Sequence, residues 1–348
     1  MDWSPDKLTP DVIGDLLSTA SETTEAELFR AADERRRECV GDEVHLRGLI
    51  EFSNRCACHC LYCGLRAPNR EITRFQLTAD QILEAARLAR RLSYGTVVMQ
   101  SGEDEGADVT AVAAVVRTIK EELGLGVTLS MGELEEDAYR MLRAAGADRY
   151  LLKHETANPV LFRTLRPGHE LSGRVGKLRL LRRLGFQIGG GSMVGLPGQS
   201  VADLVADLQL LRELDIDMAG IGPFVPAPGT PLWGSPDTWP VERRIRTTYR
   251  MMALLRLLCP LAHIPVTTAL STLDPAARAN GLTRGANVIM PNVGQVEYRR
   301  EYRIYPGKAG LEQTAEAIRA DLMQLLERLG RPVAAGPGHS RRGTGRTP

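Results

Sequence analysis

Short apolar runs and longer amphipathic runs alternate along most of the chain, and this alternation limits the possible folds more than any other feature. Eight apolar runs look like strands, and helical patterning fills most of the gaps between them. Strands joined through helices form parallel sheets with right-handed crossovers. Eight such units predict a (β/α)8 TIM-type barrel, while an open doubly wound sheet is the alternative that the pattern allows. The expected strands are residues 44–52, 96–100, 126–130, 149–153, 186–195, 218–224, 264–269 and 287–290.

The alternation divides the chain into three parts. Residues 1–43 have helical patterning and are expected to form an N-terminal helical extension. Residues 44–330 are expected to form the barrel. Residues 331–348 are rich in Gly, Pro and Arg and lack apolar periodicity, so we expect a disordered tail. The helices expected after the first strand are residues 79–93, 109–123, 134–145, 173–184, 200–214, 241–258, 274–280 and 314–329.

The charge balance excludes some classes of partner. The chain has 44 basic and 43 acidic residues, for a formal net charge of +1. This balance argues against nucleic acid or an anionic membrane as the main partner. No apolar run approaches the ~20 residues of a membrane span, and the N-terminus has acidic residues where a signal peptide has basic ones. We therefore expect a cytoplasmic protein.

Four of the six cysteines lie in the segment RCACHCLYCGLR, directly after the first expected strand. Three of them, Cys56, Cys60 and Cys63, have the spacing Cys-x-x-x-Cys-x-x-Cys. Three thiolates hold three irons of a cubane cluster and leave the fourth iron without a protein ligand, so that iron is open to chemistry. This spacing, with the aromatic Tyr62 just before the last cysteine, is typical of radical S-adenosylmethionine (SAM) enzymes.

A zinc site is the alternative interpretation of this segment. Cys58 and His59 lie inside it and offer extra ligands. Zinc sites usually combine one Cys-x-x-Cys pair with a second pair elsewhere, and no second pair exists here. The remaining cysteines, Cys39 and Cys259, stand alone, and we interpret them as small buried hydrophobic residues. We interpret Cys58 as a loop residue rather than a spare ligand. A zinc-binding scaffold without catalysis stays open as a function from another class.

Polar residues follow the ends of several expected strands, and such ends carry the active site in a barrel. Each position also has an ordinary structural interpretation: a turn for Gln100–Asp104, hydroxyls bonded to backbone for Thr128 and Ser130, and an ion pair for Lys153 and Glu155. Core packing would explain Met218. Hydroxyl and cationic groups that converge on a barrel interior form an anion-binding cavity. We interpret the glycines at 189–191 as a place where the backbone approaches a ligand, with a tight bend as the alternative.

Eight strings in order resemble the HydE family, the radical SAM maturases of [FeFe]-hydrogenase. The resemblance extends from about residue 44 to about residue 330. It implies a closed cavity inside the barrel, a [4Fe–4S] cluster on Cys56, Cys60 and Cys63, and SAM on the open iron. The strings are EFSNRCACHCLYCGLR, QSGED, RYLLKHETANPVLFRTLRP, GSMVGLPGQ, DMAGIGPFVPAPGTPL, IPVTTA, GANVIMPN and YRIYPGK.

The resemblance also implies roles for the polar residues. SAM would contact Tyr62, Gln100, Ser101, Gly102, Thr128, Ser130, Glu155, Arg174 and Met218. The substrate or anion cavity would be lined by Lys153, Thr267, Thr268, Tyr302 and Tyr305. The family's best-described member has Arg at the position of Lys153, and Lys offers a point charge where Arg binds a carboxylate through two hydrogen bonds. Some members carry a second cluster on cysteines after YPGK, but residues 309–326 contain none here, so we expect one cluster.

The implied activity is the reductive cleavage of SAM to a 5′-deoxyadenosyl radical. The radical would act on a small cysteine-bound iron–carbonyl–cyanide complex, toward the di-iron precursor of the hydrogenase H-cluster. The implied partners are other hydrogenase maturases and a low-potential electron donor, in an oxygen-free cytoplasm and without nucleic acid or membrane. The alternative within the superfamily is a mutase or sulfur-inserting enzyme related to methylornithine synthase or biotin synthase.

Overall fold

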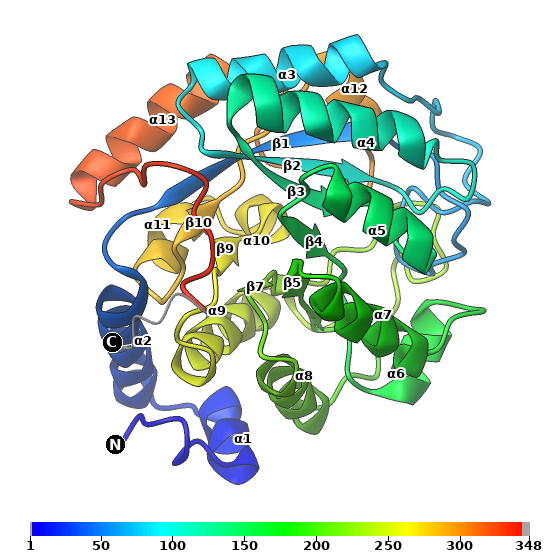
Figure 1. The fold of residues 1–348 in the computed structure, drawn as a ribbon. Helices are drawn as coiled ribbons and strands as arrows, with labels where there is room; N and C mark the ends of the chain where they lie inside the picture. The colour runs from blue at the N-terminus through cyan, green and yellow to red at the C-terminus, as the bar shows by residue number, and fades with distance from the viewer. Residues whose placement is uncertain (1, 343–348) are drawn as a thin grey trace.

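Eight parallel strands pair around a central axis in the computed structural model, which describes residues 2–342 (Figure 1). The strand order is β7-β5-β4-β3-β2-β1-β10-β9, and a parallel bridge between Met218 and His263 joins the two ends of the sheet. The prediction of a closed barrel is therefore confirmed, and a strand overlaps each predicted run. The strands are β1 (His45–Ser53), β2 (Thr96–Ser101), β3 (Gly126–Ser130), β4 (Arg149–Leu151), β5 (Gln187–Gly190), β7 (Met218–Ala219), β9 (Pro265–Val266) and β10 (Val288–Ile289).

Two short strands extend the barrel wall beyond β5 and β7. β6 (Met193–Val194) pairs in parallel with β8 (Gly222–Pro223). The predicted run 186–195 therefore contains β5 and β6, and the run 218–224 contains β7 and β8. The chain leaves the barrel sheet at Gly191 and at Gly220, and pairs again after each.

Helices surround the barrel and cover the outer face of the sheet (Figure 1). They begin with polar caps: Thr78 and Gln81 form a capping box on α3, and Ser200 and Asp203 form one on α8. The helices that the periodicity predicted are α3 (Ala79–Arg91), α4 (Val109–Thr118) with a π-helical continuation η1 (Ile119–Leu123), α5 (Glu136–Ala144), α7 (Leu171–Arg183), α8 (Val201–Glu213), α9 (Val241–Leu258), α11 (Ala277–Leu282) and α13 (Ala315–Arg328).

Three short helices were not predicted. They are α6 (Pro159–Leu165), α10 (Thr268–Leu273) and α12 (Val296–Glu301). Each is six or seven residues long, which is too short for apolar periodicity to stand out.

The N-terminal extension forms two helices, α1 (Pro10–Ser18) and α2 (Glu22–Val40), that pack on the barrel. α2 lies against α9, and α1 lies against α8 and α9. Buried Arg250 of α9 fixes this arrangement: its guanidinium donates to Leu17 O at 2.8 Å and Thr19 O at 2.7 Å, and pairs with Glu25 at 2.7 Å. The extension thus covers helix surface that would otherwise face water.

The C-terminal segment differs from its prediction. Residues 331–342 are not a disordered tail but cross the amino-terminal end of the barrel, where Figure 1 shows them in red passing near β10 and β9. Val333 bridges Val44 in parallel, and Ala334 N donates to Val44 O at 2.9 Å. Composition alone was misleading because hydrogen bonds to the barrel, which composition does not reveal, attach much of the segment. The remaining predicted tail, residues 343–348, lies outside the described residues.

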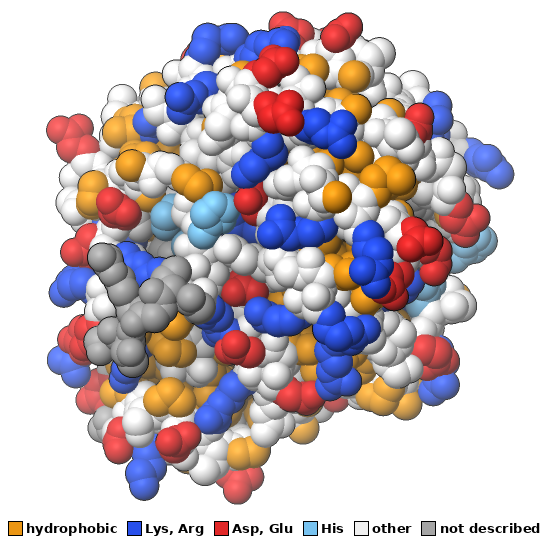
Figure 2. Space-filling view, viewed as in Figure 1, with side chains coloured by type: hydrophobic (Ala, Val, Ile, Leu, Met, Phe, Trp, Pro, Cys, Tyr) orange, Lys and Arg blue, Asp and Glu red, His pale blue; other side chains and the backbone are white. Residues whose placement is uncertain are grey.

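The register of β1 carries side chains into the barrel. Arg47, Leu49 and Glu51 alternate along the strand and line the interior, while Gly48 packs outward against Ala89 of α3. Within residues 2–342 we find no helix that is long and apolar enough to cross a membrane. Acidic and basic side chains are interspersed on the face shown in Figure 2, in line with the net charge of +1.

Candidate active site

A cavity of about 330 Å³ occupies the barrel interior and extends to loops that follow the carboxyl ends of the strands. Its wall contains every residue to which the resemblance gave a role in binding the cluster, SAM or the substrate, although these residues come from all parts of the barrel. The predicted residues in the wall are Cys56, Cys60, Tyr62, Cys63, Gln100, Ser101, Gly102, Thr128, Ser130, Lys153, Glu155, Arg174, Met218, Thr267, Thr268, Tyr302 and Tyr305.

The cysteine loop leaves β1 and is tied to its neighbours by backbone hydrogen bonds. Ala57 N donates to Glu103 O at 2.7 Å, and Leu61 N donates to Leu165 O at 2.9 Å. Gly102 allows the first contact, because a Cβ at this position would lie 2.1 Å from Arg55 O. The loop is therefore fitted between β2 and the end of α6.

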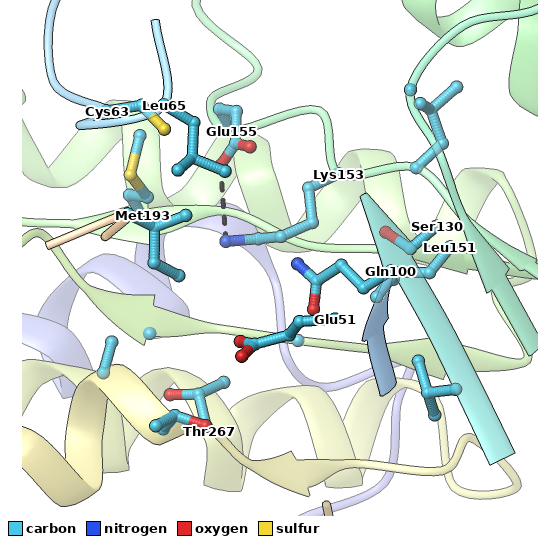
Figure 3. A pocket seen from close by; sticks show the side chains of 18 of the residues that line it. Glu51, Cys63, Leu65, Gln100, Ser130, Leu151, Lys153, Glu155, Met193 and Thr267 are labelled. Atoms are coloured by element: carbon cyan, nitrogen blue, oxygen red, sulfur yellow. Dashed lines mark ion pairs between the residues drawn. The ribbon is translucent and has the colours of Figure 1, made fainter. Parts of the chain in front are cut away.

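The three motif thiols fit an iron–sulfur cluster. Cys56, Cys60 and Cys63 are free, line one end of the cavity and are at least partly buried. Thiolates are the ligands that hold such clusters, and these three offer three positions. In Figure 3, Cys63 lies above the cavity next to Leu65 and Glu155.

Thr128 of β3 has a hydroxyl without a partner. Its side chain is buried in the cavity wall, and within residues 2–342 no group hydrogen-bonds to Thr128 Oγ1. The alternative of a hydroxyl satisfied by backbone is therefore wrong. A buried polar atom without a partner costs free energy, which a ligand atom in the cavity would recover.

Glu155 reaches the cavity through an unusual backbone conformation. Its φ is +64°, in the left-handed region, and its N–H and C=O bond to Gly191 O at 3.0 Å and Met193 N at 2.9 Å. Such a conformation costs a non-glycine residue about 1 kcal/mol or more and is common at functional sites. The surrounding ladder holds the strain and directs the carboxylate into the cavity.

Lys153 pairs with Glu155 across 3.3 Å, as the dashed line in Figure 3 shows. Burial acts to raise the pKa of Glu155, but Lys153, Arg166 and Arg174 outweigh it and hold that pKa below the ordinary value. Glu155 is therefore a carboxylate at neutral pH, and Lys153 offers its remaining donors to the cavity. The ion pair and the cavity-facing role, which the sequence left as alternatives, occur together.

Arg174 of α7 is buried and meets two acidic side chains at the cavity edge. Its Nε lies 2.8 Å from Glu133 Oε1, and one terminal nitrogen lies 3.6 Å from Glu103 Oε2. This geometry leaves guanidinium N–H groups available to an anionic ligand group.

Two threonines and two tyrosines add hydroxyls to the cavity wall. Thr267 and Thr268 do not lie in a strand as expected: β9 ends at Val266, and Thr267 caps α10 by accepting from Leu270 N at 3.3 Å. Burial raises the pKa of Tyr302 and of Tyr305, so both phenols are protonated and act as donors.

Two buried charge pairs in the wall escaped the sequence analysis. Lys308 Nζ lies 2.7 Å from Glu51 Oε2, although the two residues are 257 positions apart. Arg166 lies 3.2 Å from Glu103 Oε2. Glu103 lies in the QSGED segment and Lys308 in the YPGK segment, both of which the sequence analysis had singled out. The pairs were still missed, because no spacing rule links residues so far apart in the sequence.

The glycines at 189–191 are not in the cavity wall, so the interpretation that they approach a ligand is wrong. A Cβ on Gly189 would lie 2.6 Å from Met218 Cε, and one on Gly191 would lie 2.2 Å from Gly220 O. These glycines let β5 and β7 approach closely and make room for Met218, which does line the cavity.

A second possible ligand cluster lies behind the loop. One ligand atom each from Cys58, Glu103 and His169 falls within 4.8 Å of the others. Arg166 contacts two of the three, at 3.5 Å from Cys58 Sγ and 3.2 Å from Glu103 Oε2. A guanidinium in this position disfavours a second cation, which weakens the zinc alternative.

Comparisons with known proteins agree with this geometry. The model of the radical SAM superfamily matches residues 50–211. The [FeFe] hydrogenase maturase subunit HydE of Thermotoga maritima is 46% identical over 325 residues, which cover 93% of this chain and 92% of that protein. The chain belongs to the HydE family of radical SAM enzymes. The resemblance read from its strings is thereby confirmed.

More distant relatives share the fold. A 3-methylornithine synthase of Methanosarcina barkeri is 29% identical over 93% of this chain and 89% of its own. The crystal structure of methylornithine synthase superposes with a TM-score of 0.81 at 26% identity, over 95% of this chain and 97% of that one. The hydrogenase maturase HydG superposes with a TM-score of 0.78 at 19% identity, over 92% of this chain and 72% of that one, and supports the fold alone.

Proposed function

We propose that this HydE-family enzyme cleaves SAM reductively and directs the 5′-deoxyadenosyl radical at a small iron–carbonyl–cyanide complex of cysteine. One observation supports the proposal most. Three free thiols, a buried hydroxyl without a partner among residues 2–342, and the carboxylate of Glu155, whose backbone is strained, line one cavity inside a closed barrel. When bound, a reduced [4Fe–4S] cluster supplies the electron that breaks the carbon–sulfur bond of SAM.

The residues of the cavity divide into two groups. Near the cysteines, we assign Glu155 and Thr128 to the ribose hydroxyls of SAM and Arg174 to its carboxylate, with Met218 beside the adenine. The other proposed SAM contacts are Tyr62, Gln100, Ser101, Gly102 and Ser130. Hydroxyls and buried donors bind polar cofactor groups well because water does not compete with them.

Five other residues of the cavity wall are assigned to the substrate. Lys153 offers an ammonium group, and the hydroxyls of Thr267, Thr268, Tyr302 and Tyr305 offer donors to the same cavity. Cationic and hydroxyl donors suit an anionic complex with cyanide and carboxylate groups. Because Lys replaces a bidentate Arg, we expect a looser hold on a carboxylate here.

The proposal includes the setting of the enzyme. We propose a single cluster, since residues 309–326 contain no cysteine. The product would pass to other hydrogenase maturases, and the electron would come from a low-potential donor. Such clusters oxidise readily, so a reducing, oxygen-free cytoplasm stays our expectation.

The proposal is tested by anaerobic reconstitution of the cluster followed by SAM cleavage with dithionite. Wild type should bind iron and sulfide and form 5′-deoxyadenosine. Cys60→Ala should lose this activity, while Cys259→Ala, which alters a buried cysteine outside the cavity, should keep it. Equal cleavage by wild type and Cys60→Ala, or stoichiometric zinc without iron, would refute the proposal.

The substrate needs a separate test. Formation of 5′-deoxyadenosine that depends on the iron–carbonyl–cyanide complex would support the HydE-type reaction. SAM cleavage that this complex does not stimulate would favour a mutase or a sulfur-inserting enzyme, the alternative that the methylornithine synthase likeness keeps open.

A further inference from the structure

Arg166 brings a buried positive charge to the cysteine loop. It follows α6 directly, and only 8% of its side chain is exposed. One terminal nitrogen lies 3.5 Å from Cys60 Sγ, and the other lies 3.5 Å from Cys58 Sγ. The guanidinium is thus a donor to one of the three thiols to which we assign the cluster.

The backbone fixes this contact. Arg166 N donates to Phe162 O at 2.9 Å, which ends the helix, and the preceding Leu165 accepts from Leu61 N at 2.9 Å. The residue before Arg166 and the residue after Cys60 are therefore joined directly. These bonds place the base of the Arg166 side chain beside the cysteine loop.

Glu103 partly neutralises this charge. Its Oε2 lies 3.2 Å from Arg166 and 3.6 Å from Arg174. The Glu103 carboxylate therefore faces two arginine guanidiniums, and one of them, that of Arg166, also contacts Cys60.

The positive charge of Arg166 should make the cluster easier to reduce. Reduction by a low-potential one-electron donor takes the cluster from the [4Fe–4S]²⁺ to the [4Fe–4S]⁺ state without forming or breaking a bond, and it adds one negative charge. A nearby cation and an N–H group that donates to a ligand sulfur both favour that added charge. The effect is large where water is excluded, and Arg stays protonated at every accessible pH.

We propose that Arg166 sets the reduction potential of the cluster, through its contact with Cys60 and its charge, and that Glu103 limits the effect. Arg166 is then a positioning residue for electron entry and does not touch the substrate. The inference rests on the proposed function, because it needs the cluster on Cys60. It goes beyond that function by naming a residue that controls how readily the cluster is reduced.

The test is an anaerobic redox titration, followed by electron paramagnetic resonance, of reconstituted protein without SAM. Arg166→Met removes the charge and the donor, so the midpoint potential should fall. Glu103→Gln leaves the charge of Arg166 without its counter-ion, so the potential should rise. Arg163→Met is the matched control. Arg163 lies in α6, three residues before Arg166, is exposed and pairs with exposed Glu170 at 3.6 Å, so the potential should not change.

The opposite signs separate electrostatic tuning from a merely structural role. Equal potentials for wild type and Arg166→Met at equal iron and sulfide content would overturn the inference, as would shifts of the same sign in Arg166→Met and Glu103→Gln. If Arg166→Met does not take up a cluster, Glu103→Gln decides alone, and an unchanged potential refutes the inference. SAM cleavage by wild type supports the proposed function separately, so the two can fail independently.

Discussion

The ammonium group of Lys308 lies between the two carboxylate oxygens of Glu51, at 2.5 Å from one and 2.7 Å from the other, inside the cavity wall. Asn292 donates to the same carboxylate at 2.9 Å. Burial raises the pKa of Glu51 above its ordinary value, and Lys308 opposes that rise without cancelling it. The free-energy cost of removing both charges from water is therefore offset by their close attraction.

Lys308→Met should destabilise the fold in a pH-dependent way. Because the pKa of Glu51 is higher in the folded chain than in the unfolded one, folding takes up a proton between the two values, and stability falls as pH rises through that window. Loss of Lys308 raises the folded pKa further. Unfolding near pH 8 should show a loss of about 3–5 kcal/mol. The loss should shrink as the pH falls, because protonation of Glu51 removes the unpaired buried charge.

Glu51→Gln combined with Lys308→Met provides the control for this prediction. The double variant removes both charges of this pair, so it should recover much of the lost stability and show little pH dependence from this site. A Lys308→Met loss that stays constant from pH 5 to pH 8 would contradict the assignment to Glu51.

Thr128→Val should weaken SAM binding without weakening the fold. The hydroxyl of Thr128 has no partner among the described residues, so its removal costs no protein hydrogen bond. If SAM uses that hydroxyl, binding to the reconstituted protein should fall by about 1 kcal/mol, or roughly fivefold in Kd. Isothermal titration calorimetry and thermal unfolding measure the two quantities.

Thr248→Val is the matched comparison. Thr248 is fully buried in α9, and its hydroxyl donates to Arg244 O at 2.7 Å. This variant should lose stability and leave SAM binding unchanged, the reverse of Thr128→Val. Unaltered SAM affinity in Thr128→Val would remove Thr128 from the cofactor site.

Gly102→Ala should prevent correct seating of the cysteine loop. The new Cβ would lie 2.1 Å from Arg55 O and 2.8 Å from Cys56 Cβ, so the loop would have to move. We expect iron and sulfide content to fall after reconstitution, together with SAM cleavage. Gly176→Ala in α7, where nothing lies within 4 Å of the added atom, should keep full content and gain a few tenths to ~1 kcal/mol of stability. Normal iron content in Gly102→Ala would show that the loop tolerates the shift.

The fold and most of the site could be predicted because their signals are local. Each strand is a short apolar run, each long helix has a periodic stripe, and the polar residues at strand ends meet wherever a parallel barrel closes. Thr128 and Ser130, near the end of a single expected strand, were predicted in this way, and both line the cavity. The cysteine loop could be predicted without tertiary information, because the spacing of its cysteines alone indicates an iron–sulfur cluster.

What could not be predicted depends on contacts between distant residues. Glu51 stands inside an apolar strand, and its partner Lys308 lies near the other end of the chain. Arg166 lies in a short loop after an unpredicted helix, 106 positions from Cys60. Residues 331–342 have the composition of a disordered tail, and their order comes from carbonyl groups that accept hydrogen bonds from buried arginines of the barrel.

Gly338→Ala tests that last interpretation. Gly338 has φ of +56°, and its carbonyl accepts from Arg47 at 3.3 Å and from Arg149 at 2.9 Å. A Cβ here would lie 2.4 Å from the ring of His45, so the variant adds a clash to the strain of a left-handed backbone. Gly330→Ala is the control, because Gly330 has φ of +62° with nothing within 4 Å.

The control should lose about 1 kcal/mol from backbone strain alone. Gly338→Ala should lose clearly more, because the segment must leave the barrel and two buried arginines then lose acceptors. Limited proteolysis should also cut Gly338→Ala near its C-terminus faster than the control. His45→Ala in the Gly338→Ala background should recover part of the difference, since it removes the clashing ring. Equal melting temperatures for Gly338→Ala and Gly330→Ala would mean that residues 331–342 do not dock on the barrel as described.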